Sequence, residues 1–285
     1  MPMAVVSAIA GAWALAITAE ATGTRLVDQA VASGGGGASL GSQSAVSFVC
    51  PLHLSALPAG SSGQILGNPS HATSFWLAFA LFLVAWQAMI AAMMLPSSLP
   101  LIRLFAFASA GAPARRRAMV AFLGGYALVW TSFGTVAFAG DALLHRLIEQ
   151  TAGLRAHQWV IVAALLALAG AVQFTPLKDR CLTQCRHPGA FLIRHYRRGT
   201  GRAFTLGLRH GLFCLGCCWA LMLVMFAAGA ASLIWMGALT ALMVYEKTAR
   251  HGDQTVPLAG IALLAWAALV LVHPAGLPVL LRGGV

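Results

Sequence analysis

One stretch decides the kind of fold that this chain adopts, and it reads His210-Gly-Leu-Phe-Cys-Leu-Gly-Cys-Cys-Trp-Ala-Leu-Met-Leu-Val-Met-Phe-Ala-Ala-Gly229. After the opening histidine, its only ionisable side chains are three cysteines. Its length matches the roughly 20 apolar residues that a helix needs to cross a bilayer. Cys214, Cys217 and Cys218 are spaced i, i+3 and i+4, so a helix presents their thiols on one face. The stretch predicts a membrane helix that carries a row of thiols.

The composition extends this prediction to the whole chain. Hydrophobic residues make up 59% of the 285 residues and charged residues only 9%, against about 25% charged residues in a soluble domain. We predict an all-α, polytopic transmembrane helix bundle of about seven spans, or six if one of the two short apolar segments near Gln158 and Ser232 does not cross. The predicted spans are Met3–Ala19, Ser74–Leu95, Met119–Gly140, Gln158–Phe174, His210–Gly229, Ser232–Tyr245 and Val256–His273.

The spans divide the chain into four regions. Residues 1–19 form the first helix, which lacks a positively charged start and is interpreted as a retained helix rather than a signal peptide. Residues 20–73 form a flexible outer loop rich in glycine and serine, 74–247 a core membrane domain, and 248–285 the last helix and a tail. We interpret Cys50, His53 and His71 of the outer loop as an unpaired thiol and two solvated imidazoles; the alternative is a second functional site on that side.

The positive charges predict how the chain sits in its membrane. Most of the 18 Lys and Arg residues fall in the loops Pro100–Ala118 and Thr175–Arg209 and in the loop after Glu246. Because cytoplasmic loops carry the excess of Lys and Arg, we predict a multi-pass protein of the bacterial inner membrane with a cytoplasmic amino terminus. The net charge of +11 is explained by this bias and by anionic lipid. No nucleic-acid-binding motif accompanies it, so we expect no nucleic-acid partner.

A second cysteine pair and two methionines are predicted to lie level with the first thiols. Cys181 and Cys185 are spaced i, i+4 just after Pro176, and the second span ends with Met93 and Met94. Thiolates and thioethers are soft ligands that select Cu(I), and thiolates alone also bind Zn. We therefore expect Cu(I), or alternatively Zn, at this inner boundary. The predicted ligands are Cys214, Cys217, Cys218, Cys181 and Cys185, with Met93, Met94 and His210 as auxiliary ligands.

Glu246 ends the sixth predicted span, beside Lys247. We interpret it as a boundary carboxylate that pairs with Lys247 or with a loop arginine. The alternative is that it accepts a hydrogen bond from a metal ligand or binds the metal itself.

Four segments carry a resemblance to a known family. They are Ala88-Met-Ile-Ala-Ala-Met-Met-Leu-Pro-Ser97, Gln173-Phe-Thr-Pro-Leu-Lys-Asp-Arg-Cys-Leu-Thr-Gln-Cys-Arg186, His210-Gly-Leu-Phe-Cys-Leu-Gly-Cys-Cys-Trp-Ala-Leu-Met222 and Tyr245-Glu-Lys247. In this order they resemble a bacterial family of predicted metal-binding integral membrane proteins, the domain of unknown function 2182. The resemblance covers roughly Ser74 to Lys247. It implies a helical membrane fold and a suspected metal site, with copper sometimes proposed.

Three functions remain open from the sequence. The first is a soft-metal protein, with copper as the expected ion, that handles, delivers or inserts the ion together with a metal-donor or metal-acceptor protein. The chain has no nucleotide-binding motif and few ionisable residues in its spans, which argues against a pump. The second is a membrane thiol–disulfide oxidoreductase that uses Cys214-x-x-Cys217, with one thiol activated at a helix start. The third is a structural subunit whose cysteines only pack.

Hydrolytic catalysis is not expected, because Ser97, Asp141 and His145 lie in no motif that assembles a triad. The oligomeric state stays open, since a glycine-rich helix face suits a contact within the chain or between copies.

Overall fold

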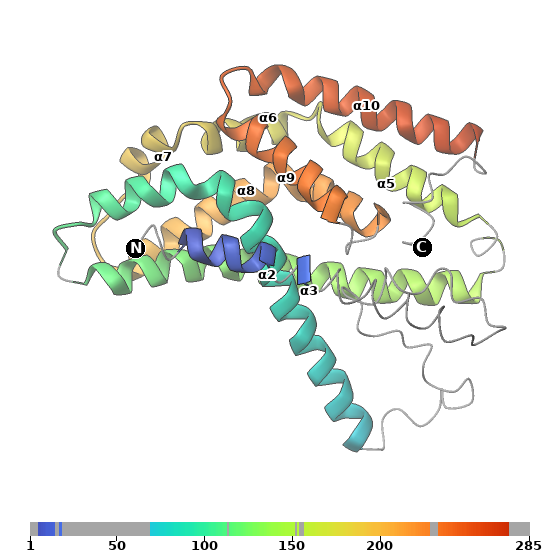
Figure 1. Cartoon of the computed structure of the whole chain (residues 1–285), viewed down its shortest axis with the longest axis horizontal. Coiled ribbons are helices and arrows are strands. Elements are labelled where there is room, and N and C mark those ends of the chain that lie inside the picture. The colour runs from blue at the N-terminus through green and yellow to red at the C-terminus, as the bar shows by residue number, and fades with distance from the viewer. Residues whose placement is uncertain are drawn as a thin grey trace.

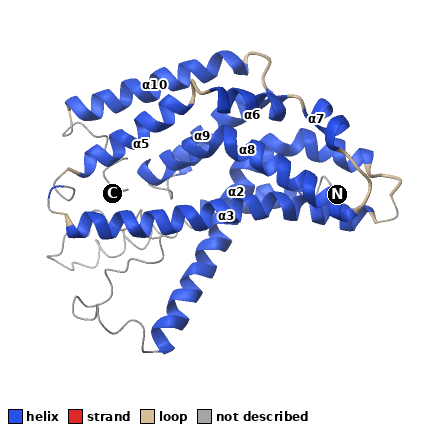
Figure 2. Ribbon diagram, turned by 180° about the vertical axis from the view of Figure 1, so that it is seen from behind, coloured by secondary structure: helices blue, strands red, loops and turns tan. Residues whose placement is uncertain are grey.

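The structure is a computed structural model that describes residues 5–14, 17–18, 69–112, 114–151, 153, 157–228 and 233–273. All regular structure in these residues is helical, which confirms the all-α class. Figures 1 and 2 show α5 and α10 side by side along one edge of the molecule, with α3 on the other side of the bundle and the amino-terminal half of α2 projecting beyond it. The helices are Val5–Ala14, α2 (Pro69–Ala108), α3 (Arg115–Gln150), α5 (Gln158–Val172), α6 (Pro176–Arg186), α7 (Pro188–His195), α8 (Thr200–Ala228), α9 (Leu233–Thr248) and α10 (Gly252–Val272).

The second helix bends in its middle. The sequence predicts that it ends at Leu95, but α2 continues through Pro96 and Pro100. A proline inside a helix removes one backbone donor and kinks the helix, and Figure 1 shows the resulting change of direction. The carbonyl of Ala92, which loses its donor to Pro96, accepts a hydrogen bond from Trp13 Nε1 at 3.2 Å. The amino-terminal helix therefore docks at the bend.

Glycines bring α3 and α8 into close contact. A Cβ atom on Gly207 would overlap the carbonyl oxygen of Phe122, and one on Gly125 would overlap that of Phe204. A Cβ on Gly211 would lie 3.0 Å from the Val129 side chain. Small residues permit such backbone contact between apolar helices, and here the contact lies within the chain.

A sharp turn after α5 positions the short helix α6. The two helices meet at an angle of 63°. Thr175 caps α6, because its Oγ1 accepts a hydrogen bond from the backbone of Lys178 at 3.3 Å, and proline follows in the first turn. Both features are typical of a helix start. Lys178, Cys181 and Leu182 form the buried face of α6, and α6 packs against α8.

Four of the described helices are long and apolar enough to cross a membrane, or five if α5 and α6 are counted as one broken span. The predicted number of about seven spans is therefore not confirmed. α5 has 15 residues and α9 has 16, and the described amino-terminal apolar helix is Val5–Ala14. At 1.5 Å per residue each is shorter than the roughly 30 Å apolar core of a bilayer.

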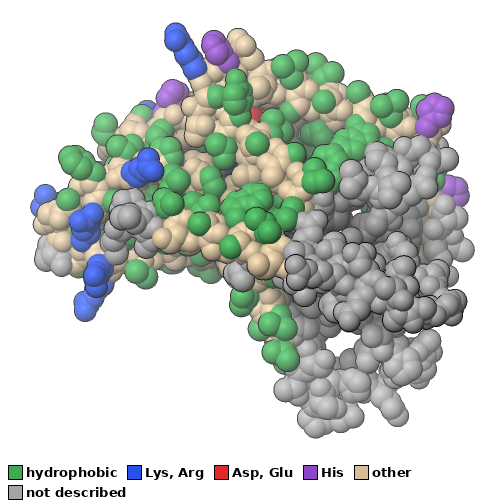
Figure 3. All heavy atoms as spheres, viewed as in Figure 1, with side chains coloured by type: hydrophobic (Ala, Val, Ile, Leu, Met, Phe, Trp, Pro, Cys, Tyr) green, Lys and Arg blue, Asp and Glu red, His purple; other side chains and the backbone are tan. Residues whose placement is uncertain are grey.

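Positive side chains gather at one end of the molecule, on the left in Figure 3, over the end that holds α7 and the connection from α2 to α3. A hydrogen bond from Tyr196 Oη to Ala108 O, at 3.1 Å, joins the two basic connections. The hollow between α7 and the start of α8 is lined by Arg194, Arg197, Arg202 and Arg209. The two large basic loops predicted to share one side thus lie together.

Candidate metal centre

The three cysteines of α8 are buried side by side. Cys214, Cys217 and Cys218 expose 3% or less of their surface. The Cys217 thiol donates to the backbone oxygen of Cys214 at 3.1 Å, and the Cys218 thiol donates to the same oxygen at 2.8 Å. The predicted shared face is therefore present. All five described cysteines are free thiols.

The two cysteines of α6 reach the same place from a neighbouring helix. Cys181 Sγ lies only 2.5 Å from where a Cβ atom on Gly216 would stand, so this thiol packs against the backbone of α8. The Cys185 thiol lies near that of Cys217 and interacts with it electrostatically. Cys185 is half-buried, whereas the other four described cysteines are buried.

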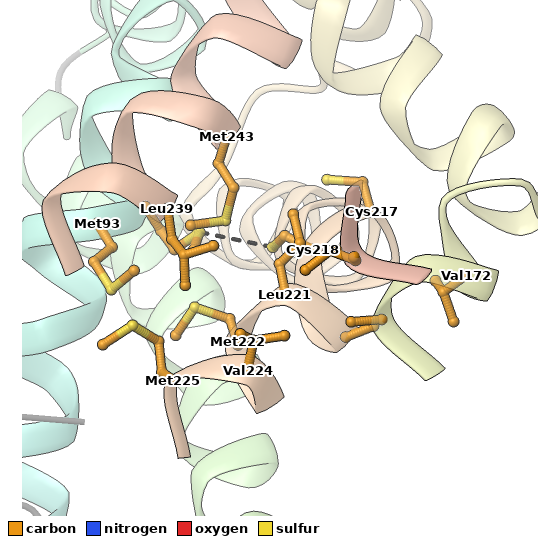
Figure 4. Close-up of a cluster of buried hydrophobic side chains, with 14 of the residues drawn as sticks. Met93, Val172, Cys217, Cys218, Leu221, Met222, Val224, Met225, Leu239 and Met243 are labelled. Carbon is orange, nitrogen blue, oxygen red and sulfur yellow. Dashed lines mark hydrogen bonds between the residues drawn. The ribbon is translucent and has the colours of Figure 1, made fainter. Parts of the chain in front are cut away.

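Methionines close the cluster from the side of α2. Met93 and Met94 are fully buried, and the Cys218 thiol lies 3.7 Å from Met94 Sδ. Figure 4 shows Met93 of α2, Met222 and Met225 of α8, and Met243 of α9 around the same core, with Cys218 facing them. We use the term sulfur cluster for the side chains of Met93, Met94, Cys181, Cys185, Cys214, Cys217 and Cys218.

His210 lies beside the sulfur cluster rather than among the sulfurs. Its Nε2 atom is hydrogen-bonded to Ser98 Oγ at 3.1 Å, and its ring stacks on Tyr126 with centroids 5.5 Å apart. Tyr126 in turn is hydrogen-bonded through its hydroxyl to Cys214 Sγ at 3.3 Å. In this conformation His210 reaches the thiols through Tyr126, and its predicted role as an auxiliary ligand stays a prediction.

Two lysines lie unexpectedly inside the protein. Lys247, which the sequence assigns to a basic loop, is 5% exposed, with its Nζ 3.3 Å from Cys214 Sγ. Lys178 is 1% exposed, and it pairs with Glu246 at 2.8 Å and contacts Gln173. The expected partners of Glu246 were therefore wrong, because Lys178 arrives from α6, a helix distant in sequence. Hydropathy places such residues at a boundary and gives no sign that neighbouring helices enclose them.

The distances between the sulfur atoms can be compared with those of sulfur ligands on a soft metal ion. Metal–sulfur bonds of about 2.3 Å place two sulfurs on one tetrahedral ion about 3.8 Å apart. The Cys218–Met94 separation of 3.7 Å matches this spacing. No three His, Cys, Asp or Glu side chains among the described residues form a ready metal-binding group. A further thiol can therefore bind an ion held by Cys218 and Met94 only after it turns away from its present hydrogen bond. The donors themselves are of the kind that Cu(I) prefers.

One argument for the oxidoreductase hypothesis, a thiol at a helix start, does not hold in the structure. It required a thiol at a helix start, where backbone donors and the helix dipole stabilise a thiolate. Cys214 instead lies about four turns inside α8, which begins at Thr200.

The outer-side residues can be located only in part. Cys50 and His53 lie outside the described residues, and for His71 only the backbone, in the first turn of α2, is described. The interpretation of these residues as an unpaired thiol and two solvated imidazoles, and the alternative of a second functional site, both stay predictions.

These features define a class: an all-helical protein with apolar helices of membrane-spanning length that enclose a cluster of thiols and thioethers. The comparison with known families indicates which metal is involved. The model of the family described as PpoB2, copper chaperone, matches residues 83–270, well over half of the chain. The chain belongs to this family, which indicates copper handling. No curated protein and no solved structure matches the chain.

Proposed function

We propose that this protein is a membrane-embedded copper chaperone that holds Cu(I) in the sulfur cluster and passes it to a partner protein. One observation carries the proposal: α2, α6 and α8, which are distant in sequence, converge with their sulfur-bearing side chains, and Cys218 and Met94 lie 3.7 Å apart. Membership in a copper chaperone family agrees with it.

The arrangement suits transfer better than permanent storage. The cluster offers more soft donors than one ion needs, so an ion can move by exchanging one sulfur for another. The half-buried Cys185 lies near Cys217, which is one residue from Cys218. We propose that Cu(I) enters and leaves through Cys185 and is held deeper, at Cys214, Cys218 and Met94. The partner is a metal-donor or metal-acceptor protein that presents its own soft ligands.

The proposal includes the membrane. We propose an inner-membrane protein of a bacterium, in which the arginine-rich end beside α7 faces the cytoplasm, as the distribution of positive charge requires. The region division at residues 19, 73 and 247 and the cytoplasmic amino terminus belong to this proposal. So does the kinship with the domain of unknown function 2182.

One contact favours a second candidate function. Cys185 and Cys217 come from different helices and lie near each other, so they are placed to exchange two thiols for one disulfide. In that case the protein is a thiol–disulfide oxidoreductase: as Cys185 and Cys217 form a disulfide, the disulfide of a partner protein takes up the two electrons and two protons and becomes two thiols.

The first experiment is the metal content of the protein purified in detergent under strictly reducing conditions, measured by mass spectrometry. Wild type is compared with the Cys214→Ser/Cys217→Ser/Cys218→Ser variant, and Cys50→Ser serves as the control, because Cys50 is not among the predicted ligands. We expect near-stoichiometric copper in wild type and in the control, and loss of copper in the triple variant.

Two other results contradict the proposal. Zinc in place of copper refutes the choice of ion. An empty wild type that takes up neither ion on titration removes the metal function. A thiol redox titration of Cys185 and Cys217 then separates the oxidoreductase from a structural subunit, because only the oxidoreductase forms a reversible disulfide.

A further inference from the structure

A lysine is built into the wall of the sulfur cluster. Lys247, near the end of α9, is 5% exposed. Its Nζ lies 3.3 Å from Cys214 Sγ and 3.2 Å from Ser97 Oγ. The ammonium thus touches a thiol of α8 on one side and the bend of α2 on the other, where a bound ion would have its ligands.

The positive charge of Lys247 is not balanced by the nearest acid. Glu246, the neighbouring carboxylate, pairs with Lys178 at 2.8 Å. Among the described residues no carboxylate lies within ion-pair distance of Lys247. The three buried charges therefore sum to one positive charge, located at the sulfurs.

Folding alone does not explain such a residue. Burial of an ammonium is costly, and replacement of buried ions by apolar residues of similar volume is often neutral or stabilising. Methionine has nearly the length of lysine, and Met243, one turn earlier on α9, is fully buried. The charge at position 247 is therefore expected to act on whatever the sulfurs bind.

We infer that Lys247 makes the sulfur cluster selective for monovalent Cu(I) over divalent ions such as Zn(II). The inference rests on the proposed function and specifies that the metal ion the protein carries is monovalent. A metal–sulfur bond of about 2.3 Å places an ion on Cys214 at most about 5.6 Å from the ammonium. Repulsion at that distance, with an effective dielectric constant of about 20, weakens binding on the order of a hundredfold for each unit of metal charge. A divalent ion meets this repulsion twice and a monovalent ion once.

Ionisation of one further thiol beside a divalent ion offsets part of the difference. The net discrimination expected from Lys247 is therefore smaller than the full repulsion, about tenfold in the ratio of the two affinities.

The test compares the affinities of the purified full chain for Cu(I) and for Zn(II), each by competition with a chelator under reducing conditions. Lys247→Met removes the charge and keeps the length, and Lys247→Arg keeps the charge. Arg180→Met is the matched control, because Arg180 is an exposed cation on α6 next to Cys181. We expect Lys247→Met to raise the affinity for Zn(II) relative to that for Cu(I) about tenfold, and the other two variants to leave the ratio near that of wild type. Thermal unfolding of each variant verifies that it is folded.

The possible failures are distinct. An unchanged ratio in a folded Lys247→Met variant, with Cu(I) still bound by wild type, overturns the inference and leaves the proposed function standing. An equal change in Lys247→Arg also overturns it, because the effect then comes from shape and not from charge. A wild type that binds neither ion overturns the proposed function itself, and the inference with it.

Discussion

Helix α8 has two faces that are packed in opposite ways. Toward α3 it presents glycines, and the backbone of α3 lies so close that a single added carbon would overlap a carbonyl oxygen at Gly207. Toward α2 and α6 it presents cysteines and Gly216. Cys218 lies next to the sulfur of Met94, and Gly216 lies against the thiol of Cys181, which can rotate. The glycine face fixes helix positions, because backbone cannot yield. The sulfur face leaves side chains free to turn, which a site that exchanges a metal ion requires.

The largest effect is expected from a change on the glycine face. Gly207→Ala places a Cβ atom against the backbone of Phe122, and such overpacking costs about 3 kcal/mol of unfolding free energy. Gly124→Ala is the control, because nothing lies within 4 Å of its Cβ position and alanine favours the helix. Thermal unfolding in detergent measures both. Equal stability of the two variants would show that α3 and α8 are not held at this distance.

A change on the sulfur face is expected to affect the metal rather than the fold. In Gly216→Ala the new carbon meets Cys181 Sγ at 2.5 Å. The thiol can turn aside, and the helix gains about 1 kcal/mol from the loss of glycine, so the unfolding free energy changes by less than about 1 kcal/mol. The displaced ligand lowers the affinity for Cu(I) about tenfold, or roughly 1.4 kcal/mol.

The control for this change is Gly201→Ala, which has open space around the added carbon on the same helix. Competition with a Cu(I) chelator gives the affinities. An affinity of Gly216→Ala equal to that of Gly201→Ala would remove Cys181 from the ligand set.

A smaller effect is expected from the thioether of Met94. Met94→Leu conserves volume and costs less than about 1.5 kcal/mol of stability, but it deletes the sulfur that lies 3.7 Å from Cys218. We expect the affinity for Cu(I) to fall about fivefold, or roughly 1 kcal/mol. Met119→Leu is the control, since Met119 is buried in a separate apolar cluster. Equal affinities for the two variants would assign Met94 to packing alone.

The smallest effect tests how α6 is held beside the sulfur face. Thr175→Ala removes the cap of α6, which is typically worth about 1 kcal/mol. We expect a modest fall in the unfolding temperature and a loss of about twofold in affinity for Cu(I), because α6 carries Cys181 and Cys185. Thr205→Ala serves as control, since that exposed hydroxyl bonds only to its own helix. A wild-type melting curve for Thr175→Ala would mean that packing alone orients α6.

The sequence predicted the parts of the site that depend on local spacing. The i, i+3, i+4 pattern of Cys214, Cys217 and Cys218 fixes a shared helix face whatever the neighbours are. The glycines of the same helix predicted close helix packing, which α3 provides. The family resemblance and the soft donor set both indicate copper, with zinc as the alternative.

Contacts between helices and the positions at which helices end could not be predicted from the spacing of residues along the sequence. The burial of Lys247 and the pairing of Lys178 with Glu246 join residues on different helices. The number of spans depends on where helices end, and proline at position 96 bends α2 without ending it, because Trp13 replaces the missing donor at Ala92.

The amino-acid sequence by itself determined that this protein is helical, apolar and equipped with thiols and thioethers in rows, because composition and helical periodicity are properties of single segments. Only the tertiary structure decided that α2, α6 and α8 meet with their sulfurs together and that a lysine stands among them. Hydrophobic contact has no direction and leaves many pairings open. The close fit of Gly207 against the backbone of Phe122, and of Gly125 against that of Phe204, selects one of them.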